Sequence, residues 1–149
     1  MPTATELLDE IAESWGWTGL QPSAVVAENA FGNLLVEDKS GRFWRMCPED
    51  VYCERVAWDR EALQALFGDQ DFLEDWEMFA LVESAVAKLG ANAPGEKYCL
   101  LTPGALGGAY SVDNIGRAPL VELVRFSGGL GRYLRDLPDG APVRFRVVD

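Results

Sequence analysis

Strand-like and helix-like segments occur in separate runs along this sequence, and this order limits the folds that it can adopt. Residues 31–38 and 42–46 carry strand patterns on either side of "KSG", a turn-like stretch, and residues 51–57 could form a third strand. Helix patterns follow over residues 59–89. The absence of βαβ alternation favours an α+β fold built on an antiparallel β-meander.

Two helices are indicated by the residues at their starts. Thr3-x-x-Glu6 has the form of a capping box, so we expect a leading helix within residues 1–16. Asp59 is placed to cap a second helix that runs to Phe67, just before a glycine. Both helices therefore have a local start signal.

A longer helix is predicted from Phe72 to Leu89, with Gly90 at its end. Its Phe72, Trp76, Phe79 and Val86 fall on one apolar side that is expected to be covered, and Glu83 lies within this stripe. Because a buried carboxylate is costly unless it is paired, we expect Glu83 to bridge to one of the C-terminal arginines. An exposed surface of aromatic residues with Glu83 is the alternative.

The rest of the chain is predicted as strands, loops and one more helix. Residues 97–102 have a strand pattern, and a short strand is expected at 110–112. Pro119 suits the first position of a helix that "SGGLG" would interrupt or bend. After the turn "PDG", a final strand is expected over 142–148.

No internal repeat or linker is visible, so residues 1–149 are expected to form one compact domain, a meander packed with about four helices. A chain of 149 residues can bury a sizeable core. Most of the five tryptophans should lie in that core, and one or two could instead contact a partner. They are Trp15, Trp17, Trp44, Trp58 and Trp76.

The sequence has no histidine and three cysteines, Cys47, Cys53 and Cys99. Histidine-based triads and Cys/His zinc sites are therefore excluded, and zinc ligation by cysteine alone would need a fourth thiolate. We expect no metal, no cofactor and three buried, reduced thiols. The acidic N-terminus differs from a secretory signal, and no apolar run reaches the roughly 20 residues of a membrane helix, so a cytoplasmic protein is expected.

The net charge of −11 is unevenly distributed. Acidic residues concentrate between Glu49 and Glu77, where only Arg55 and Arg60 oppose them. Such a chain should repel nucleic acid and anionic lipid, and should attract a basic protein.

Two glycine-rich segments, "GALGG" (104–108) and "SGGLGR" (127–132), could in principle cradle a phosphate. The known phosphate-binding patterns place the glycines between a strand and a helix and add a lysine or a distant acid. Neither segment has that context. Close backbone packing or a helix break is the favoured interpretation.

Four segments together resemble the C-terminal domain family of type VI secretion DNase-immunity proteins, the Tdi family: "ENAFGNLLVEDKSGRFWRMCPED", "FLEDWEM", "LGGAYSVDNIG" and "VELVRFSGGLGRYLRDLPDGAPVRFRV". The likeness runs from about Trp17 to the C-terminus and contains no catalytic signature. It implies a cytoplasmic bacterial protein that is not an enzyme, and that binds and blocks a cognate secreted toxin, often a nuclease. In this family a separate N-terminal domain frequently precedes the domain, whereas here only the leading helix does.

An acidic protein complements the basic active site of a nuclease. We therefore expect the acidic region to be the partner-binding face, with no direct binding of nucleic acid or membrane. Its candidate residues are Glu49, Asp50, Asp69, Asp71, Glu74, Asp75, Trp76 and Glu77. Helix capping, a solvated face, and catalysis or metal binding by paired carboxylates are the alternatives for the same side chains.

Two other functions remain open. A stand-alone interaction or scaffold domain with an unknown partner would have the same fold and charge. A small carboxylate-based hydrolase would need a deep pocket with two carboxyl groups about 5–10 Å apart, for example Asp113 near Asn114 and Gly108.

Overall fold

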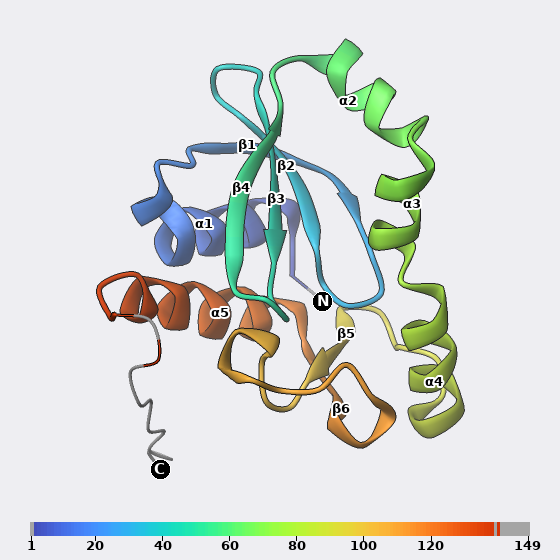
Figure 1. Cartoon of the computed structure of the whole chain (residues 1–149). Helices are drawn as coiled ribbons and strands as arrows, with labels where there is room; N and C mark the ends of the chain where they lie inside the picture. Colours follow the sequence, from blue (N-terminus) through green and yellow to red (C-terminus); the bar gives the residue numbers. More distant parts are fainter. Residues whose placement is uncertain (1, 139, 141–149) are drawn as a thin grey trace.

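The computed structural model of the chain describes residues 2–138 and 140. A four-stranded antiparallel sheet in the order β1-β2-β3-β4 forms the upper half in Figure 1, and the antiparallel pair β5–β6 lies below it. The strands are β1 (Pro22–Glu28), β2 (Leu34–Asp38), β3 (Phe43–Cys47), β4 (Tyr52–Ala57), β5 (Glu96–Leu100) and β6 (Ile115–Pro119). The predicted α+β fold with an antiparallel meander is confirmed.

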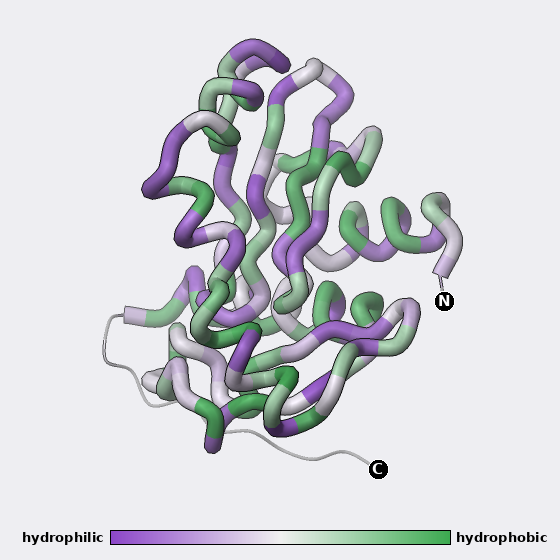
Figure 2. Tube along the Cα trace, turned by 90° about the vertical axis from the view of Figure 1, so that its right-hand side faces the viewer, coloured by the Kyte–Doolittle hydropathy of each residue, from purple (hydrophilic) through white to green (hydrophobic). Residues whose placement is uncertain are grey.

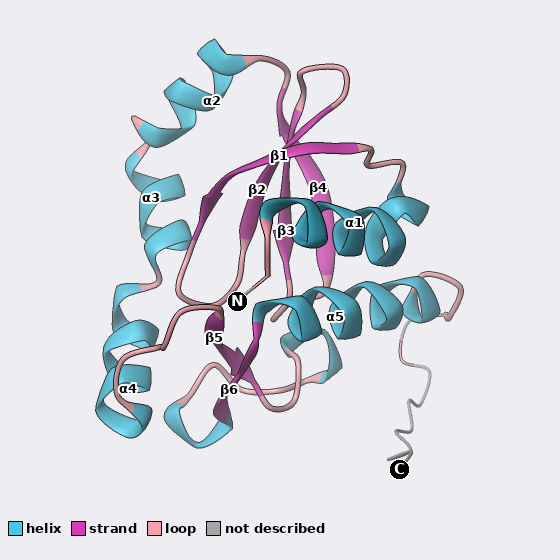
Figure 3. Cartoon of the chain, turned by 180° about the vertical axis from the view of Figure 1, so that it is seen from behind, coloured by secondary structure: helices cyan, strands magenta, loops and turns pink. Residues whose placement is uncertain are grey.

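Helices cover both faces of the larger sheet. Figure 3 shows α1 lying across the back of the sheet with α5 below it, and Figure 1 shows α2, α3 and α4 following one another along the right-hand side. The α-helices are α1 (Ala4–Trp15), α2 (Arg60–Phe67), α3 (Gln70–Glu77), α4 (Phe79–Leu89) and α5 (Leu120–Leu134). Single 3₁₀ turns are η1 (Gly16–Thr18), η2 (Gly104–Leu106) and η3 (Val112–Asn114).

The helix starts follow the predicted signals. Thr3 and Glu6 form the complete capping box of α1, and the Asp59 side chain accepts a hydrogen bond from the Ala62 amide at the start of α2. These caps satisfy amides that have no partner inside the helix. The leading helix is therefore confirmed, with Gly16 at its C-cap.

Three local expectations are wrong, and one strand was missed. The predicted helix 72–89 is divided at Met78, whose backbone is left-handed, into α3 and α4. Helix α5 continues without a break through Ser127 to Gly131. Strand β1 was not expected, and residues 110–112 form no strand, since β6 begins only at Ile115. The strand predicted over 142–148 lies outside the described residues.

Three groups of buried side chains form the core. The first joins α1 and α5 to one face of the sheet: Leu7, Ile11, Trp15, Leu20, Leu34, Val36, Met46, Leu120 and Val124. The second joins α4 to the small sheet: Phe31, Ala85, Tyr98, Leu100 and Ile115. The third packs α2 and α3 against the other sheet face: Leu35, Phe43, Ala57, Leu63 and Trp76. Figure 2 shows the alternation of hydrophobic and hydrophilic residues along helices and strands that such one-sided burial requires.

The glycine-rich segment of α5 is a close-packing surface. A Cβ atom on Gly128 would lie 2.7 Å from the carbonyl carbon of Ser14 in α1. The indole of Trp17 bridges the two helices, because its Nε1 donates to the carbonyl oxygens of Ser14 at 3.0 Å and Gly128 at 3.1 Å. Close backbone packing, one of the two expected interpretations, is therefore confirmed for this segment.

Candidate partner-binding groove

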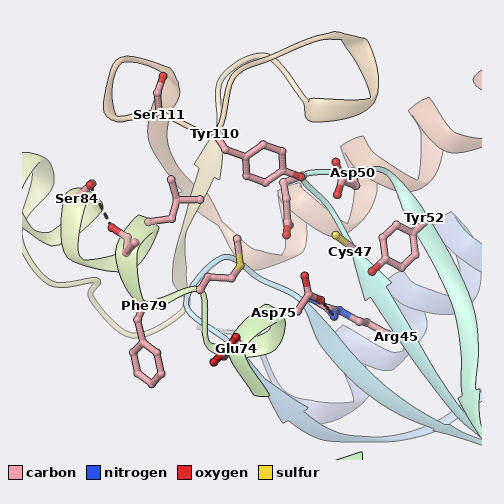
Figure 4. A pocket seen from close by; sticks show the side chains of 14 residues that line it. Arg45, Cys47, Asp50, Tyr52, Glu74, Asp75, Phe79, Ser84, Tyr110 and Ser111 are labelled. Atoms are coloured by element: carbon pink, nitrogen blue, oxygen red, sulfur yellow. Dashed lines mark hydrogen bonds and ion pairs between the residues drawn. The ribbon is translucent and has the colours of Figure 1, made fainter. Parts of the chain in front are cut away.

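A groove of about 510 Å³ opens where the end of β3, the joint between α3 and α4, and the loop before η3 meet (Figure 4). This volume lies in the range of protein ligand pockets. It is lined by Arg45, Cys47, Glu49, Asp50, Tyr52, Glu74, Asp75, Met78, Phe79, Ala80, Leu81, Ser84, Tyr110 and Ser111. We call it the acidic groove.

The acidic groove unites carboxylates that are distant in sequence. Glu49 and Asp50 follow β3, whereas Glu74 and Asp75 belong to α3. Arg45 is the single basic residue in the lining, against these four acidic residues. The fold therefore brings together acidic residues from both ends of the region between Glu49 and Glu77.

A chain of polar contacts forms the floor of the groove. Arg45 is only 5% exposed, and its Nε donates to Oδ1 of Asn33 at 3.0 Å while its Nη1 pairs with Asp75. Asn33 donates in turn to both carboxylate oxygens of Glu49, at 3.0 and 2.8 Å. Every member of this Asp75–Arg45–Asn33–Glu49 relay has a partner, which a buried polar network needs in order to be stable.

Asn29 holds the loop that carries Asn33. Its Oδ1 accepts hydrogen bonds from the amides of Phe31 and Asn33, and its Nδ2 donates to the carbonyl oxygen of Trp76 at 2.9 Å. The loop between β1 and β2 is thus tied to the end of α3. This connection sets the position of Asp75 relative to the sheet.

The groove shifts the pKa of several of its side chains, among them Glu49 and Tyr110. Burial raises the pKa of the Glu49 carboxyl, while hydrogen bonds from its own backbone amide and from the Cys47 and Asn33 side chains act in the opposite direction. Burial, together with the hydrogen bond and the charge of Asp50, raises the pKa of Tyr110. Figure 4 shows Tyr110 extending from its loop towards Asp50. Tyr110 is therefore a neutral phenol at physiological pH.

Two backbone positions beside the groove are left-handed without being glycine. Val51 has φ of 56° and Met78 has φ of 52°. Such a conformation is unfavourable for a side chain with a Cβ, above all a β-branched one, and often marks a functional site. At Met78 it turns the chain between α3 and α4 and opens one wall of the groove.

The predicted site residues fall into three sets. Asp50, Glu74 and Asp75 line the groove and are exposed. Asp71 and Glu77 are exposed on α3 but do not line it, and Asp69 caps α3 by accepting the amides of Asp71 and Phe72. Glu49 also lines the groove but is only 5% exposed, and Trp76 is 4% exposed, so these two side chains offer a partner little surface.

Sequence reasoning missed the aromatic residues of the groove. Phe79, which the uninterrupted helix had placed on the buried side, is 71% exposed because the break at Met78 changes the phase of α4. Tyr110 is 47% exposed and lies in a loop where a short strand was expected. Glu83 is also exposed, and forms no ion pair within residues 2–138 and 140.

The glycine-rich loop 104–108 packs closely against the residues that follow β3. The Gly104 amide donates to the carbonyl oxygen of Glu49 at 2.6 Å, and a Cβ on Gly104 would lie 2.5 Å from Oδ1 of Asp50. Asp113 is exposed and does not line the groove, and Asn114 holds its own loop through the Thr102 amide and the Thr102 and Ala109 carbonyls. The suggested hydrolase site at these residues has no support.

The described part of the chain contains neither a metal-binding cluster of side chains nor a helix that could span a membrane. No cluster of three or more Cys, Asp or Glu side chains there is arranged to hold a metal ion. Within the same residues, no helix combines the length and the apolar character that a membrane crossing requires.

One protein-family model matches part of the chain. Residues 58–131 match the family described as "T6SS immunity protein Tdi1, C-terminal". The resemblance to the Tdi family is therefore confirmed over α2 to α5, a shorter segment than the one expected from Trp17. The match supports an immunity role connected with type VI secretion and favours binding over catalysis.

The fold also resembles a solved structure, the crystal structure of Atu4351 from Agrobacterium tumefaciens, with a TM-score of 0.59 and 13% sequence identity. The aligned region covers 86% of this chain and 65% of that one. At this identity the likeness concerns the fold alone. No curated protein matches the chain.

Proposed function

Because residues 58–131 match an immunity-protein family, we propose that this chain is a cytoplasmic bacterial immunity protein that binds and neutralises a cognate type VI secreted toxin, a basic nuclease. The acidic groove and the exposed carboxylates of α3 form the toxin-binding face of this proposal. Inhibition then requires no bond to be made or broken by this chain.

The observation that carries the proposal is the charge of the groove. Four carboxylates and one guanidinium line it, so it attracts cations. A nuclease must attract phosphate and presents a basic surface, for which this groove is the electrostatic complement. Such complementarity speeds association and makes it sensitive to salt.

Exposed aromatic side chains at the groove supply apolar contact area. Phe79 and Tyr110 are 71% and 47% exposed. Large aromatic residues next to desolvated charges are typical of the few residues that dominate binding energy. We therefore expect Phe79→Ala to leave the association rate unchanged and to raise the dissociation rate of the complex.

The test measures association of the chain with the toxin encoded beside its gene, at low and high salt. In the reversed variant, Asp71, Glu74 and Glu77 are changed to Lys, and we expect the association rate to fall by about tenfold or more. Asp75 is left unchanged because its replacement would leave Arg45 without its carboxylate partner. Loss of binding would then reflect charge and not misfolding.

The control reverses three exposed acidic residues elsewhere, Asp9 and Glu13 on α1 and Glu122 in the first turn of α5. It makes the same change in net charge at another face. An equal loss of association rate in both variants would reject the acidic face as the toxin-binding surface, although the immunity function itself could still hold. Absence of a complex with the neighbouring toxin would reject the immunity function in favour of an interaction domain with another partner.

A further inference from the structure

Trp58 is the exposed tryptophan of the described chain. It follows β4 directly and is 60% exposed, whereas Trp15 and Trp76 are buried and Trp17 and Trp44 are half-buried. Exposing so large an apolar ring to water is unfavourable for an isolated protein. The residues around the ring show what kind of surface it belongs to.

Two guanidinium groups are held against this ring. The Cζ atoms of Arg55 and Arg42 lie 4.4 and 4.7 Å from the Trp58 ring centroid. Arg42 Nη1 also donates to the Trp58 carbonyl oxygen at 2.9 Å, and Arg55 lies 5.8 Å from the ring of Trp44. Arg42, Arg55 and Trp58 therefore form an ordered surface, which we call the Trp58 patch.

Among the described residues, the arginines of the Trp58 patch are in no ion pair with a carboxylate, although the charge of Arg42 acts on the nearby Asp38. Arg60, the first residue of α2, instead pairs with Glu37. A guanidinium stacked on an aromatic ring keeps N–H donors at its edge for bidentate contact with an oxyanion. Stacking also fixes the side chain before binding, which reduces the entropy lost on association.

We propose that the Trp58 patch is a second docking point, separate from the acidic groove, for a carboxylate-bearing segment of a protein partner. Two guanidiniums suit two carboxylates, and tryptophan and arginine are the residues most enriched at binding hot spots. A nucleic acid is disfavoured because its row of phosphates would extend beyond the two guanidiniums and meet the exposed Glu54, Asp59 and Glu61 of a chain of net charge −11, whereas two carboxylates are matched by the two guanidiniums.

The test titrates the purified chain with two peptides, acetyl-Gly-Glu-Glu-Gly-amide and its Gln-Gln counterpart, and follows the indole NMR signal of Trp58, assigned with Trp58→Phe. We expect the Glu peptide alone to shift this signal to saturation. The double variant Arg42→Gln/Arg55→Gln should bind the Glu peptide about tenfold or more weakly than the parent, since two charge-assisted contacts are removed. The control Arg132→Gln, at an exposed arginine on α5, should bind as the parent does.

The proposal is wrong if the Glu peptide gives no saturable shift, if the Gln peptide binds equally, or if the double variant binds like the parent. It is also wrong if a 12-nucleotide oligothymidylate binds the patch more tightly than the Glu peptide. Concentration-dependent self-association through Trp58, seen by sedimentation, would assign the patch to a second copy of the chain and would likewise overturn it. None of these outcomes depends on the toxin.

Discussion

Two adjacent glycines of α5 experience opposite surroundings. Gly128 faces α1, where a Cβ would collide with the Ser14 backbone, whereas Gly129 is exposed and a Cβ there would meet nothing within 4 Å. The first glycine is thus required by packing. The second only lowers the helix propensity of α5.

The two alanine variants should therefore change stability in opposite directions. Gly128→Ala should lower the free energy of unfolding by about 1–3 kcal/mol, because the helices must separate to admit the methyl group. Gly129→Ala should raise it by roughly 0.5–1 kcal/mol. Urea unfolding of both variants checks this, and equal effects would mean that α1 and α5 are not in close contact.

Asp38 should contribute to the pH dependence of stability. Burial opposes its ionisation, but hydrogen bonds from the Trp44 indole and from the Arg42 and Ser40 amides lower the pKa of its carboxyl below the ordinary value. A lowered folded-state pKa stabilises the protein above the unfolded-state value of about 3.9, and this stabilisation is lost as the pH falls through the folded-state pKa. The stability difference between the parent and Asp38→Asn should be constant above about pH 5 and shrink below pH 4. Urea unfolding between pH 2 and 7 measures it, and a difference independent of pH would contradict the assignment.

At the scale of secondary-structure elements, the Asp75–Arg45–Asn33–Glu49 relay connects β3 to α3. Arg45 serves both partners only because its guanidinium presents donors in a fixed fork. The Arg45 guanidinium also lies over the ring of Trp76, with 5.3 Å between its Cζ atom and the ring centroid, which adds a further link to α3. Lysine has the charge but not this geometry.

Arg45→Lys should therefore lower the free energy of unfolding by about 1–3 kcal/mol, since one buried acceptor of the relay is left without a donor. Arg60→Lys is the matched control, because Arg60 is exposed where it pairs with Glu37, and such surface pairs contribute about 0–1 kcal/mol. Denaturant unfolding of the two variants is the measurement. A similar small loss in both would show that the relay adds nothing to stability.

Elements with a local signal were predictable, and those decided by tertiary contacts were not. Thr3 and Asp59 cap helices by contacts within three residues, so the sequence alone indicated both starts. The left-handed Met78 carries no such signal, because methionine is not a typical residue for that conformation. Because residues 72–89 were predicted as one helix across Met78, the exposure of Phe79 was not predicted. The acidic side of the groove was anticipated from charge, but Tyr110 reaches it from a loop whose position depends on packing.

The molecule as a whole carries a net charge of −11, which has opposite effects on folding and on binding. Repulsion among like charges destabilises the compact state, and added salt screens it. The same salt weakens attraction to a basic partner.

Raising NaCl from about 20 to 300 mM should therefore raise the melting temperature by a few degrees, while slowing association with the toxin. Thermal unfolding followed by circular dichroism, with association measured in the same buffers, checks both signs. A melting temperature that falls with salt would show that specific ion pairs outweigh the general repulsion.

The relay beneath the groove also bears on how such a protein can change partners over evolutionary time. Asp75 and Glu49 are committed to Arg45 and Asn33, so their replacement carries a folding penalty. Glu74 and Phe79 are exposed and take no part in the relay, so they are free to vary at little cost to stability. Descendants of this sequence can thus acquire a new binding specificity at the rim of the groove while the buried relay beneath it stays the same.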